Sequence, residues 1–412
     1  MMDKKLLKNP NFVIYLILSF FVRGGDTIFK IALILFIISK GGTAGTVGVV
    51  LILTILPAVL FGPVSGIFSD RFNLKVIIHL ANFVRATMLI LIPFVSNISS
   101  IYIIGFILAV ATLFSVPSQK VILPLIVERE DIPVGAGYLA STRSIIDTLI
   151  PIFGSGLTLL IGFTQTFFIN ASFYILASAL LLFLKFDGKP NQKPHQEGKK
   201  KSVFVEVIDG FKYIFENKKL KVITIASIFT LGLSAGIEIL IPIHILFDMK
   251  YSDSAYGLLI GILGAGIAIG GIIIPKLKAK LRLSALFIFA FAIVLDGLGF
   301  LFFNLLSSSL ILSLIIMFIS GISSAGFLIM VDSYMQTEVE KIYLGRTYSS
   351  YFSLSNIFSV LIMGVVSLGA EKSGTSLMFT LCSVGILITG LITLYLSITE
   401  YKDNLNAEKV NI

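Results

Sequence analysis

Twelve apolar segments, each about 20 residues or longer, recur along the chain and constrain its fold more than any other feature. They cover residues 11–38, 46–69, 75–95, 100–122, 138–162, 166–186, 219–247, 255–277, 283–304, 309–332, 346–370 and 374–398. A helix of about 20 apolar residues is long enough to cross the hydrocarbon core of a bilayer. The chain is 13% charged, whereas a typical soluble protein is about 25% charged. We therefore predict an all-α membrane protein with twelve transmembrane helices.

The basic residues are distributed unevenly over the connections between these segments. If both termini and every second connection lie on one side, that side holds 25 of the 32 lysines and arginines, and the opposite connections hold Lys40, Lys250 and Lys372. Lysine and arginine are enriched in cytoplasmic loops. We therefore predict that both termini are cytoplasmic. This distribution also accounts for the net charge of +9 without a nucleic-acid partner.

The longest polar connection divides the twelve segments into six and six. We expect six-helix bundles over residues 1–186 and 219–412, joined by a cytoplasmic linker over residues 187–218. Gly66, Arg71 and Lys75 recur 205 positions later as Gly271, Lys276 and Lys280. The repetition favours two duplicated, pseudo-symmetric bundles, a transporter construction that places the substrate site at the interface between the repeats.

The linker begins with a Lys-, Pro- and Gly-containing stretch that is typical of a flexible connection. Its end, "VFVEVIDGFKYIF", spaces apolar side chains at helical intervals. These are Phe204, Ile208, Phe211 and Phe215. We expect an amphipathic helix that lies on the cytoplasmic membrane surface.

The first apolar segment carries three charged residues within the stretch "FFVRGGDTIFK", namely Arg23, Asp26 and Lys30. At 100° per residue they fall within an arc of about 60° and share one helix face. A charge deep in the bilayer costs about 2.5–3.5 kcal/mol, so we expect this face to line a wet central cavity. The glycine pair at 24–25 permits a bend or a close helix contact. Burial favours the neutral acid of Asp26 and the two cations favour its carboxylate, so both a proton carrier and a permanent ion pair remain open.

Other charges in the apolar segments are candidates for the same chemistry. Glu238 has no lysine or arginine within four residues, so we expect it to hold its proton near neutral pH, as a proton carrier or as a hydrogen-bonded neutral acid. Arg143 and Asp147, four residues apart, predict an intrahelical pair or a contact for an anionic substrate. Arg85 is expected to pair with Asp26 or Asp147 from another helix.

Several other patterns narrow the function classes. The spacings Gly257/Gly261 and Gly266/Gly270 permit close helix contacts. No Gly-x-x-x-x-Gly-Lys-Ser/Thr loop is present, which argues against an ATPase. Cys382 is the only cysteine and the chain has three histidines, so we expect no disulfide, metal site or cofactor, and no enzyme activity.

The stretch "GPVSGIFSDRFNLK" resembles the signature Gly-x-x-x-Asp-Arg-x-x-x-Lys of the major facilitator superfamily. Gly66, Asp70, Arg71 and Lys75 occupy it. Three more stretches resemble the drug-efflux branch that contains macrolide and enterobactin exporters: "RGGDTIFKIAL", "FSVPSQKVILPLIV" and "MQTEVEKIYLGRTYSSY". The antiporter motif of the fifth helix is only partly met by "PIFGSG", which has no Gly-Pro pair.

The resemblance implies the major facilitator fold and a gate on the cytoplasmic side. The signature residues would form one half of this gate, and Gln336, Gly345 and Arg346 would border the opposite half. It further implies a monomer in a bacterial plasma membrane that exports a small hydrophobic or amphipathic compound in exchange for protons by alternating access, as multidrug-resistance transporters do. Nutrient uptake, transport of a lysophospholipid-like molecule, and a membrane sensor of the same fold that transports nothing are the alternatives.

Overall fold

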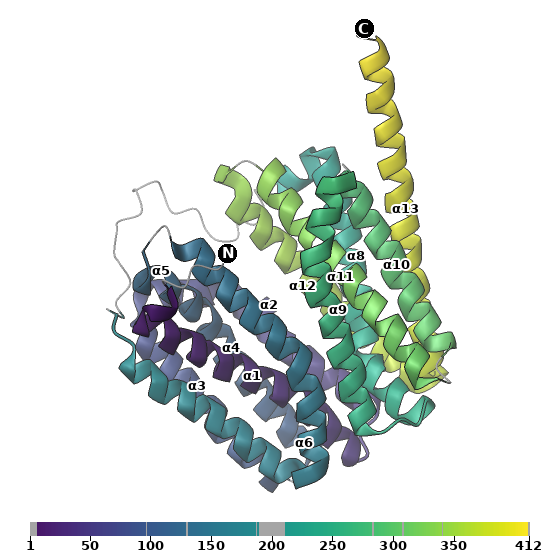
Figure 1. Cartoon of the computed structure of the whole chain (residues 1–412). Helices are drawn as coiled ribbons and strands as arrows, with labels where there is room; N and C mark the ends of the chain where they lie inside the picture. The colour runs from purple at the N-terminus through teal and green to yellow at the C-terminus, as the bar shows by residue number, and fades with distance from the viewer. Residues whose placement is uncertain are drawn as a thin grey trace. The chain divides into compact units, whose positions relative to one another are not determined.

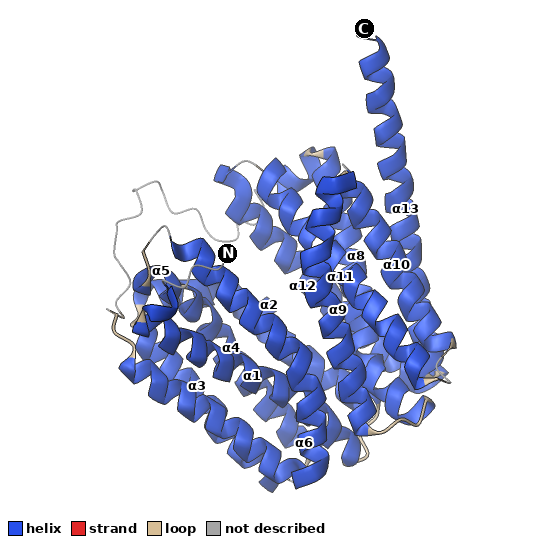
Figure 2. Ribbon diagram, in the orientation of Figure 1, coloured by secondary structure: helices blue, strands red, loops and turns tan. Residues whose placement is uncertain are grey.

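The computed structural model describes residues 6–95, 97–128, 131–186, 188, 211–281, 284–306, 309–339 and 341–410. Within these ranges the side chains of a further set of helical residues lie outside the description: 62–71, 120, 133, 152, 154–157, 159, 218, 279, 281, 336–338, 341–346, 348–349 and 400–410. The described residues form helices joined by loops, and none of them is in a strand (Figure 2). The all-α prediction is therefore confirmed.

The chain divides into two compact units, Met1–Lys199 with Asp253–Gly261, and Lys200–Ser252 with Ile262–Ile412. We call them the N-terminal unit and the C-terminal unit. The helices of the N-terminal unit (Figure 1) are α1 (Pro10–Ser39), α2 (Ala44–Arg71), α3 (Leu74–Leu91), α4 (Ile98–Lys120), the short α5 (Ile122–Ile126) and α6 (Ile132–Phe183).

The long helix α6 consists of two predicted spans joined at a glycine. Gly162 has φ 83° and ψ 168°, a backbone conformation that is open to glycine and closed to residues with a Cβ. The chain bends there, so α6 contributes a first half before Gly162 and a second half after it. Both halves were expected as separate transmembrane helices.

Helix packing in the N-terminal unit places α1 against α6, α2 against α4, and α3 against both α4 and α6. The predicted glycine pair lies at the contact between α1 and the second half of α6. A Cβ on Gly25 would lie 2.9 Å from Tyr174 Cζ and 3.1 Å from Asn170 Oδ1, and one on Gly24 would lie 3.3 Å from a ring carbon of Phe173. The pair therefore serves close helix packing.

The C-terminal unit contains six long helices (Figure 1). They are α8 (Lys218–Ile243), which continues into the π-helical turn η4 (His244–Asp248), α9 (Asp253–Leu281), α10 (Ala285–Leu305), α11 (Leu310–Glu338), α12 (Lys341–Ser373) and α13 (Thr375–Val410). The first part of α9, Asp253–Gly261, is assigned to the N-terminal unit, and the rest of this helix belongs to the C-terminal unit. Helix α10 packs on α11 and α13, and α8 packs on α12 and α13.

Glycines bring α9 and α11 into backbone contact, as their spacing predicted. A Cβ on Gly266 would lie 2.9 Å from the Cα of Gly321, and one on Gly270 would lie 2.9 Å from the Cα of Ile322. Dispersion between closely packed backbones is the main attraction available to helices in lipid.

Ten helices among the described residues are long and apolar enough to cross a membrane. Helix α1 and the first half of α6 are not among these ten, and they carry the charged residues Arg23, Asp26, Lys30, Arg143 and Asp147. With those two helices the count agrees with the predicted twelve. Large apolar side chains such as Leu160 and Phe83 are exposed, as expected of helices that lie in a bilayer.

Only part of the predicted surface helix of the linker lies within the described residues. Phe204 and Ile208 lie outside the described residues, whereas residues 211–216 form a helical turn. In that turn Ile214 is buried and Phe215 is half exposed. The membrane-surface location stays a prediction.

Candidate functional site

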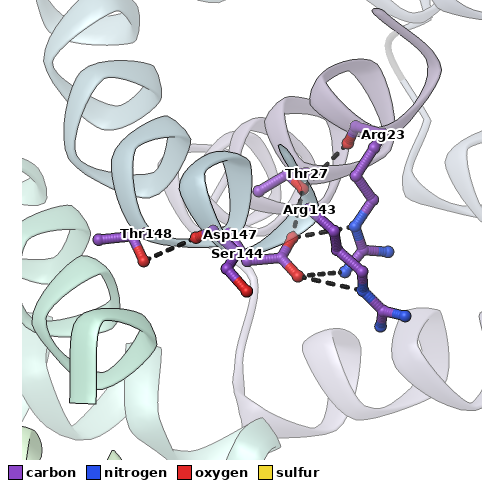
Figure 3. Close-up of polar contacts among 6 residues, drawn as sticks. All are labelled: Arg23, Thr27, Arg143, Ser144, Asp147 and Thr148. Atoms are coloured by element: carbon purple, nitrogen blue, oxygen red, sulfur yellow. Dashed lines mark hydrogen bonds and ion pairs between the residues drawn. The ribbon is translucent and has the colours of Figure 1, made fainter. Parts of the chain in front are cut away.

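A carboxylate on α6 holds two arginines in the N-terminal unit (Figure 3). Asp147, on the first half of α6, accepts two hydrogen bonds from Arg23 on α1, one from Nε at 2.9 Å and one from Nη2 at 2.8 Å. Arg143 approaches the same carboxylate from one turn earlier at 3.4 Å. Thr27 Oγ1 lies 3.5 Å from Asp147 Oδ1 and donates to the Arg23 carbonyl. The predicted pair of Arg143 and Asp147 is confirmed, but Arg23 is the closer partner.

This cluster is only partly shielded from solvent. The side chains of Arg23 and Asp147 are 40% and 30% exposed, and that of Arg143 is 67% exposed. The two-point contact fixes the planes of the guanidinium and carboxylate groups. Its exposed atoms leave room for a polar or charged ligand to approach.

A second charged cluster lies deeper in the same unit. Tyr174, on the second half of α6, donates a hydrogen bond of 2.7 Å to Asp26 Oδ1. Arg85 Nη1, from α3, lies 3.9 Å from the same oxygen, and the guanidinium carbon lies 5.2 Å from the centre of the Tyr174 ring. The Arg85 side chain is 1% exposed and that of Asp26 is 27% exposed. Of the two carboxylates proposed as partners of Arg85, the structure selects Asp26.

Helical periodicity placed Arg23, Asp26 and Lys30 on one face of α1, but Arg23 and Asp26 belong to different clusters. Arg23 turns to the first half of α6, whereas Asp26 turns to the second half of α6 and to α3. Lys30 is exposed on the same helix and also has an interaction partner. Whether this helix face lines a central cavity stays a prediction.

Two asparagines and a tyrosine near Asp26 were not predicted as site residues from the sequence. Tyr174 contacts Asp26 directly, Asn170 lies one turn away against Gly25, and Asn82 is one turn before Arg85 on α3. All three are buried. A polar residue inside an apolar segment is costly in a membrane, and that signal was available in the sequence for each of them.

Glu238, the second candidate proton carrier, lies on α8 in the C-terminal unit and is half-buried. It has an interaction partner in the structure. The nearby His244 is buried, and its Nδ1 lies 2.7 Å from Asp248 Oδ2 in the π-helical turn. Its ring packs against Phe303 and Phe379.

Two other ionisable groups within the helices, Asp296 and His79, have neutral hydrogen-bonding partners. Asp296 on α10 is buried and accepts a hydrogen bond of 2.9 Å from Ser324 on α11. His79 on α3 lies 2.6 Å, by its Nδ1, from Ser178 Oγ on α6. Among the described residues no group of three or more histidine, cysteine or acidic side chains is arranged to hold a metal ion.

The predicted gate residues lie at the ends of helices. Gly66, Asp70 and Arg71 fall in the last turns of α2, Gln336 in α11, and Gly345 and Arg346 in the first turns of α12. The side chains of all six lie outside the described residues, so their contacts stay predictions. Lys75, the last residue of the signature, is described.

Lys75 holds the end of α6 to the start of α3. Its Nζ donates a hydrogen bond of 2.7 Å to the Leu184 carbonyl, just past the last residue of α6, and lies over the Phe186 ring. The Leu74 amide donates to the Gly188 carbonyl at 2.8 Å. A cation at a helix C-terminus is favourable because the last carbonyls carry partial negative charge.

The chemistry that these arrangements support is charge binding. Asp26 has one hydrogen-bond donor and one buried cation beside it, and part of its side chain is open. Its carboxylate is the counter-charge that faces the buried guanidinium of Arg85.

Comparison with known proteins identifies the family of the chain. The sequence profile of the Major Facilitator Superfamily matches residues 15–363. The chain is 28% identical over 351 residues to the uncharacterized MFS-type transporter YfiS of Bacillus subtilis (strain 168), covering 82% of this chain and 81% of that protein. It is 22% identical over 387 residues to macrolide efflux protein A of Streptococcus pyogenes, covering 89% of this chain and 91% of that protein.

Solved structures share the fold at low sequence identity. The nucleoside transporter NupG superposes with a TM-score of 0.74 at 16% identity, over 94% of this chain and 98% of its own. A bacterial homologue of the human lysosomal transporter Spinster gives a TM-score of 0.74 at 14% identity, over 95% and 97% of the two chains. Together with the profile match over most of the sequence, these similarities show that the chain belongs to the Major Facilitator Superfamily.

Proposed function

We propose that this transporter exports a small hydrophobic or amphipathic compound, of the macrolide or siderophore kind, in exchange for protons. It works as a monomer by alternating access in a bacterial plasma membrane, with both termini in the cytoplasm. Similarity to macrolide efflux protein A supports export, and the Lys/Arg bias supports the orientation.

The observation that carries the proton coupling is the cluster of Asp26, Arg85 and Tyr174. Arg85 is buried, and Asp26 is the carboxylate that faces it at 3.9 Å. When Asp26 takes up a proton, Arg85 loses this counter-charge and keeps only the Tyr174 ring face. An uncompensated buried charge is costly, so protonation favours a rearrangement of α1 against α3 and α6. Protonation thereby changes the relative stability of two transport states.

The remaining site residues complete the proposed cycle. Glu238 on α8 is the second proton carrier. Arg23, Lys30, Arg143 and Asp147 form a polar surface that orients the substrate. Gly66, Asp70, Arg71 and Lys75 belong to the cytoplasmic gate, as do Gln336, Gly345 and Arg346, and they move as the gate opens.

The experiment that tests the proposal is transport by the purified full chain in proteoliposomes. Radiolabelled erythromycin serves as the macrolide probe, with a panel of hydrophobic drugs beside it. An imposed pH gradient drives uptake into inverted vesicles, and a pH-sensitive dye follows the protons. We expect probe accumulation to require the gradient, and probe addition to release protons.

Two neutral variants, Asp26→Asn and Glu238→Gln, identify the carriers. Each should abolish accumulation against a gradient while binding of the probe persists. The matched control is Asp253→Asn, at the first residue of α9, which should leave gradient-driven transport at its original rate. If Asp26→Asn and Glu238→Gln transport at the original rate with unchanged proton release, proton coupling through these residues is wrong. Movement of nutrients inward, with no drug transported, would favour uptake instead.

A further inference from the structure

Polar side chains form a row between α3 and the second half of α6, leading away from Asp26. At one end His79 Nδ1 on α3 lies 2.6 Å from Ser178 Oγ on α6. At the other end Arg85 lies over the Tyr174 ring, which hydrogen-bonds Asp26. Because the earlier residue of α3 pairs with the later residue of α6, the two helices run antiparallel and the row follows their interface.

Asn82 occupies the middle of this row. Along α3 it lies about 4.5 Å from both His79 and Arg85, and the two ends are about 9 Å apart. At 100° per residue its direction is midway between theirs. Because both flanking residues contact α6, Asn82 faces the same interface.

The middle of the row is buried and rich in polar atoms that have no hydrogen-bond partner among the described residues. Asn82 and Arg85 are each 1% exposed. Among the described residues no group hydrogen-bonds either side-chain polar atom of Asn82 or any of the three guanidinium nitrogens of Arg85. Buried polar atoms are nearly always hydrogen-bonded, to the protein or to ordered water. Ordered water is the partner that such atoms take where no protein group reaches them.

We infer that His79, Ser178, Asn82 and Arg85 line a water-filled proton pathway that connects Asp26 to the end of the N-terminal unit where α3 begins. This inference rests on the proposed proton coupling through Asp26 and extends it. The start of α3 carries the signature residue Lys75, so by the Lys/Arg bias this end faces the cytoplasm.

The pathway moves a proton without any other reactant than water. The Asp26 O–H bond breaks as the proton passes to the adjacent water, and each water in turn gives one of its own protons onward until His79 or bulk water receives it. Asn82 and Arg85 hold the waters in place, and Arg85 keeps its own proton. Its positive charge also disfavours an excess proton beside it, so the pathway carries protons only when Asp26 supplies a compensating negative charge.

The charged and titratable groups around the two ends are consistent with this role. Asp26 faces Arg85 from α3 and Tyr174 from α6, with Arg23 and Lys30 on its own helix. His79 faces Ser178 from α6, and Lys75 precedes it by one turn of α3. Part of the Asp26 side chain is also exposed, which gives protons one route to this carboxyl. The pathway gives them a second route within the unit.

The test measures proton exchange at Asp26 directly, without a transport substrate. A rapid pH change is applied to the purified full chain in proteoliposomes, and infrared difference spectroscopy follows the C=O stretch of the protonated carboxyl. Loss of the band in Asp26→Asn assigns it. Asn82→Leu should slow its appearance by about tenfold or more, because one hydrogen-bonding site of the pathway is removed. Ser178→Ala, which removes only a hydroxyl, should slow it in the same direction.

Matched variants separate this effect from misfolding. Asn82→Gln keeps an amide in the row and should recover most of the rate. Thr87→Val, on another face of α3 about 140° from Asn82, should exchange protons at the original rate. If Asn82→Leu and Ser178→Ala also exchange at the original rate while Asp26→Asn removes the band and uncouples transport, the pathway is wrong and the proposed function stands. If Asp26→Asn leaves the band and coupled transport intact, both are wrong.

Discussion

The two aspartates of the N-terminal unit should differ in what their neutralisation costs, because they neutralise arginines in different surroundings. Asp26→Asn leaves Arg85, 1% exposed, without the carboxylate 3.9 Å away. Removing one partner of a buried pair costs about 3–5 kcal/mol. Since Asp26 is 27% exposed and its contact with Arg85 is long, we expect a loss of about 3 kcal/mol in the free energy of unfolding, at the lower end of that range.

Asp147→Asn provides the comparison. Its two arginines are 40% and 67% exposed, and in the predicted wet cavity water would solvate them once the carboxylate is neutral. Exposed ion pairs contribute about 0.2–1 kcal/mol, and we expect a loss of about 1 kcal/mol. The predicted difference between the variants is therefore roughly 2 kcal/mol, although Asp147 makes the shorter contacts.

The assay is denaturant unfolding of the purified chain in mild detergent at neutral pH, followed by far-UV circular dichroism. Cys382, buried in α13, offers a second probe, because a thiol reagent should label it only when the C-terminal unit opens. The double variant Asp26→Asn with Arg85→Met removes both charges and should recover most of the stability. Equal losses for Asp26→Asn and Asp147→Asn, or no recovery in the double variant, would refute the argument from burial.

Four further substitutions test the contacts between helices, each by the same unfolding measurement. Gly25→Val should cost about 1–3 kcal/mol, because its Cβ would meet Tyr174 at 2.9 Å; a neutral result would mean that α1 can move away from α6. Gly266→Ala should cost a similar amount at the backbone contact of α9 with α11, whereas Gly271→Ala, whose Cβ would meet nothing within 4 Å, should be neutral or stabilising by up to about 1 kcal/mol. Asn304→Leu removes the side-chain bonds that tie α10 to the first turns of α13 and should cost about 2–3 kcal/mol; unchanged stability would show that water replaces those bonds.

The class of fold and the approximate bounds of most helices could be predicted from the order of the amino acids alone. Predicted spans such as 11–38 and 255–277 lie within α1 (Pro10–Ser39) and α9 (Asp253–Leu281). These predictions succeed because the thickness of the bilayer sets the length that an apolar helix needs. The length of each apolar segment can be counted along the chain. The signature around Gly66 indicated the family for a similar reason, since the spacing of its residues is local.

The choice of partners was decided by the tertiary structure. Helical periodicity placed Arg23 and Asp26 on one face, yet they bind Asp147 and Tyr174, which are 27 residues apart on the two halves of α6. The bend at Gly162 separates those halves, and the small surface of Gly25 lets the second half reach Asp26. Which carboxylate lies next to Arg85 depends on how α3 packs against the two halves of α6. A pattern read along one helix gives the direction of a side chain, but the group that it meets depends on where other helices lie in space.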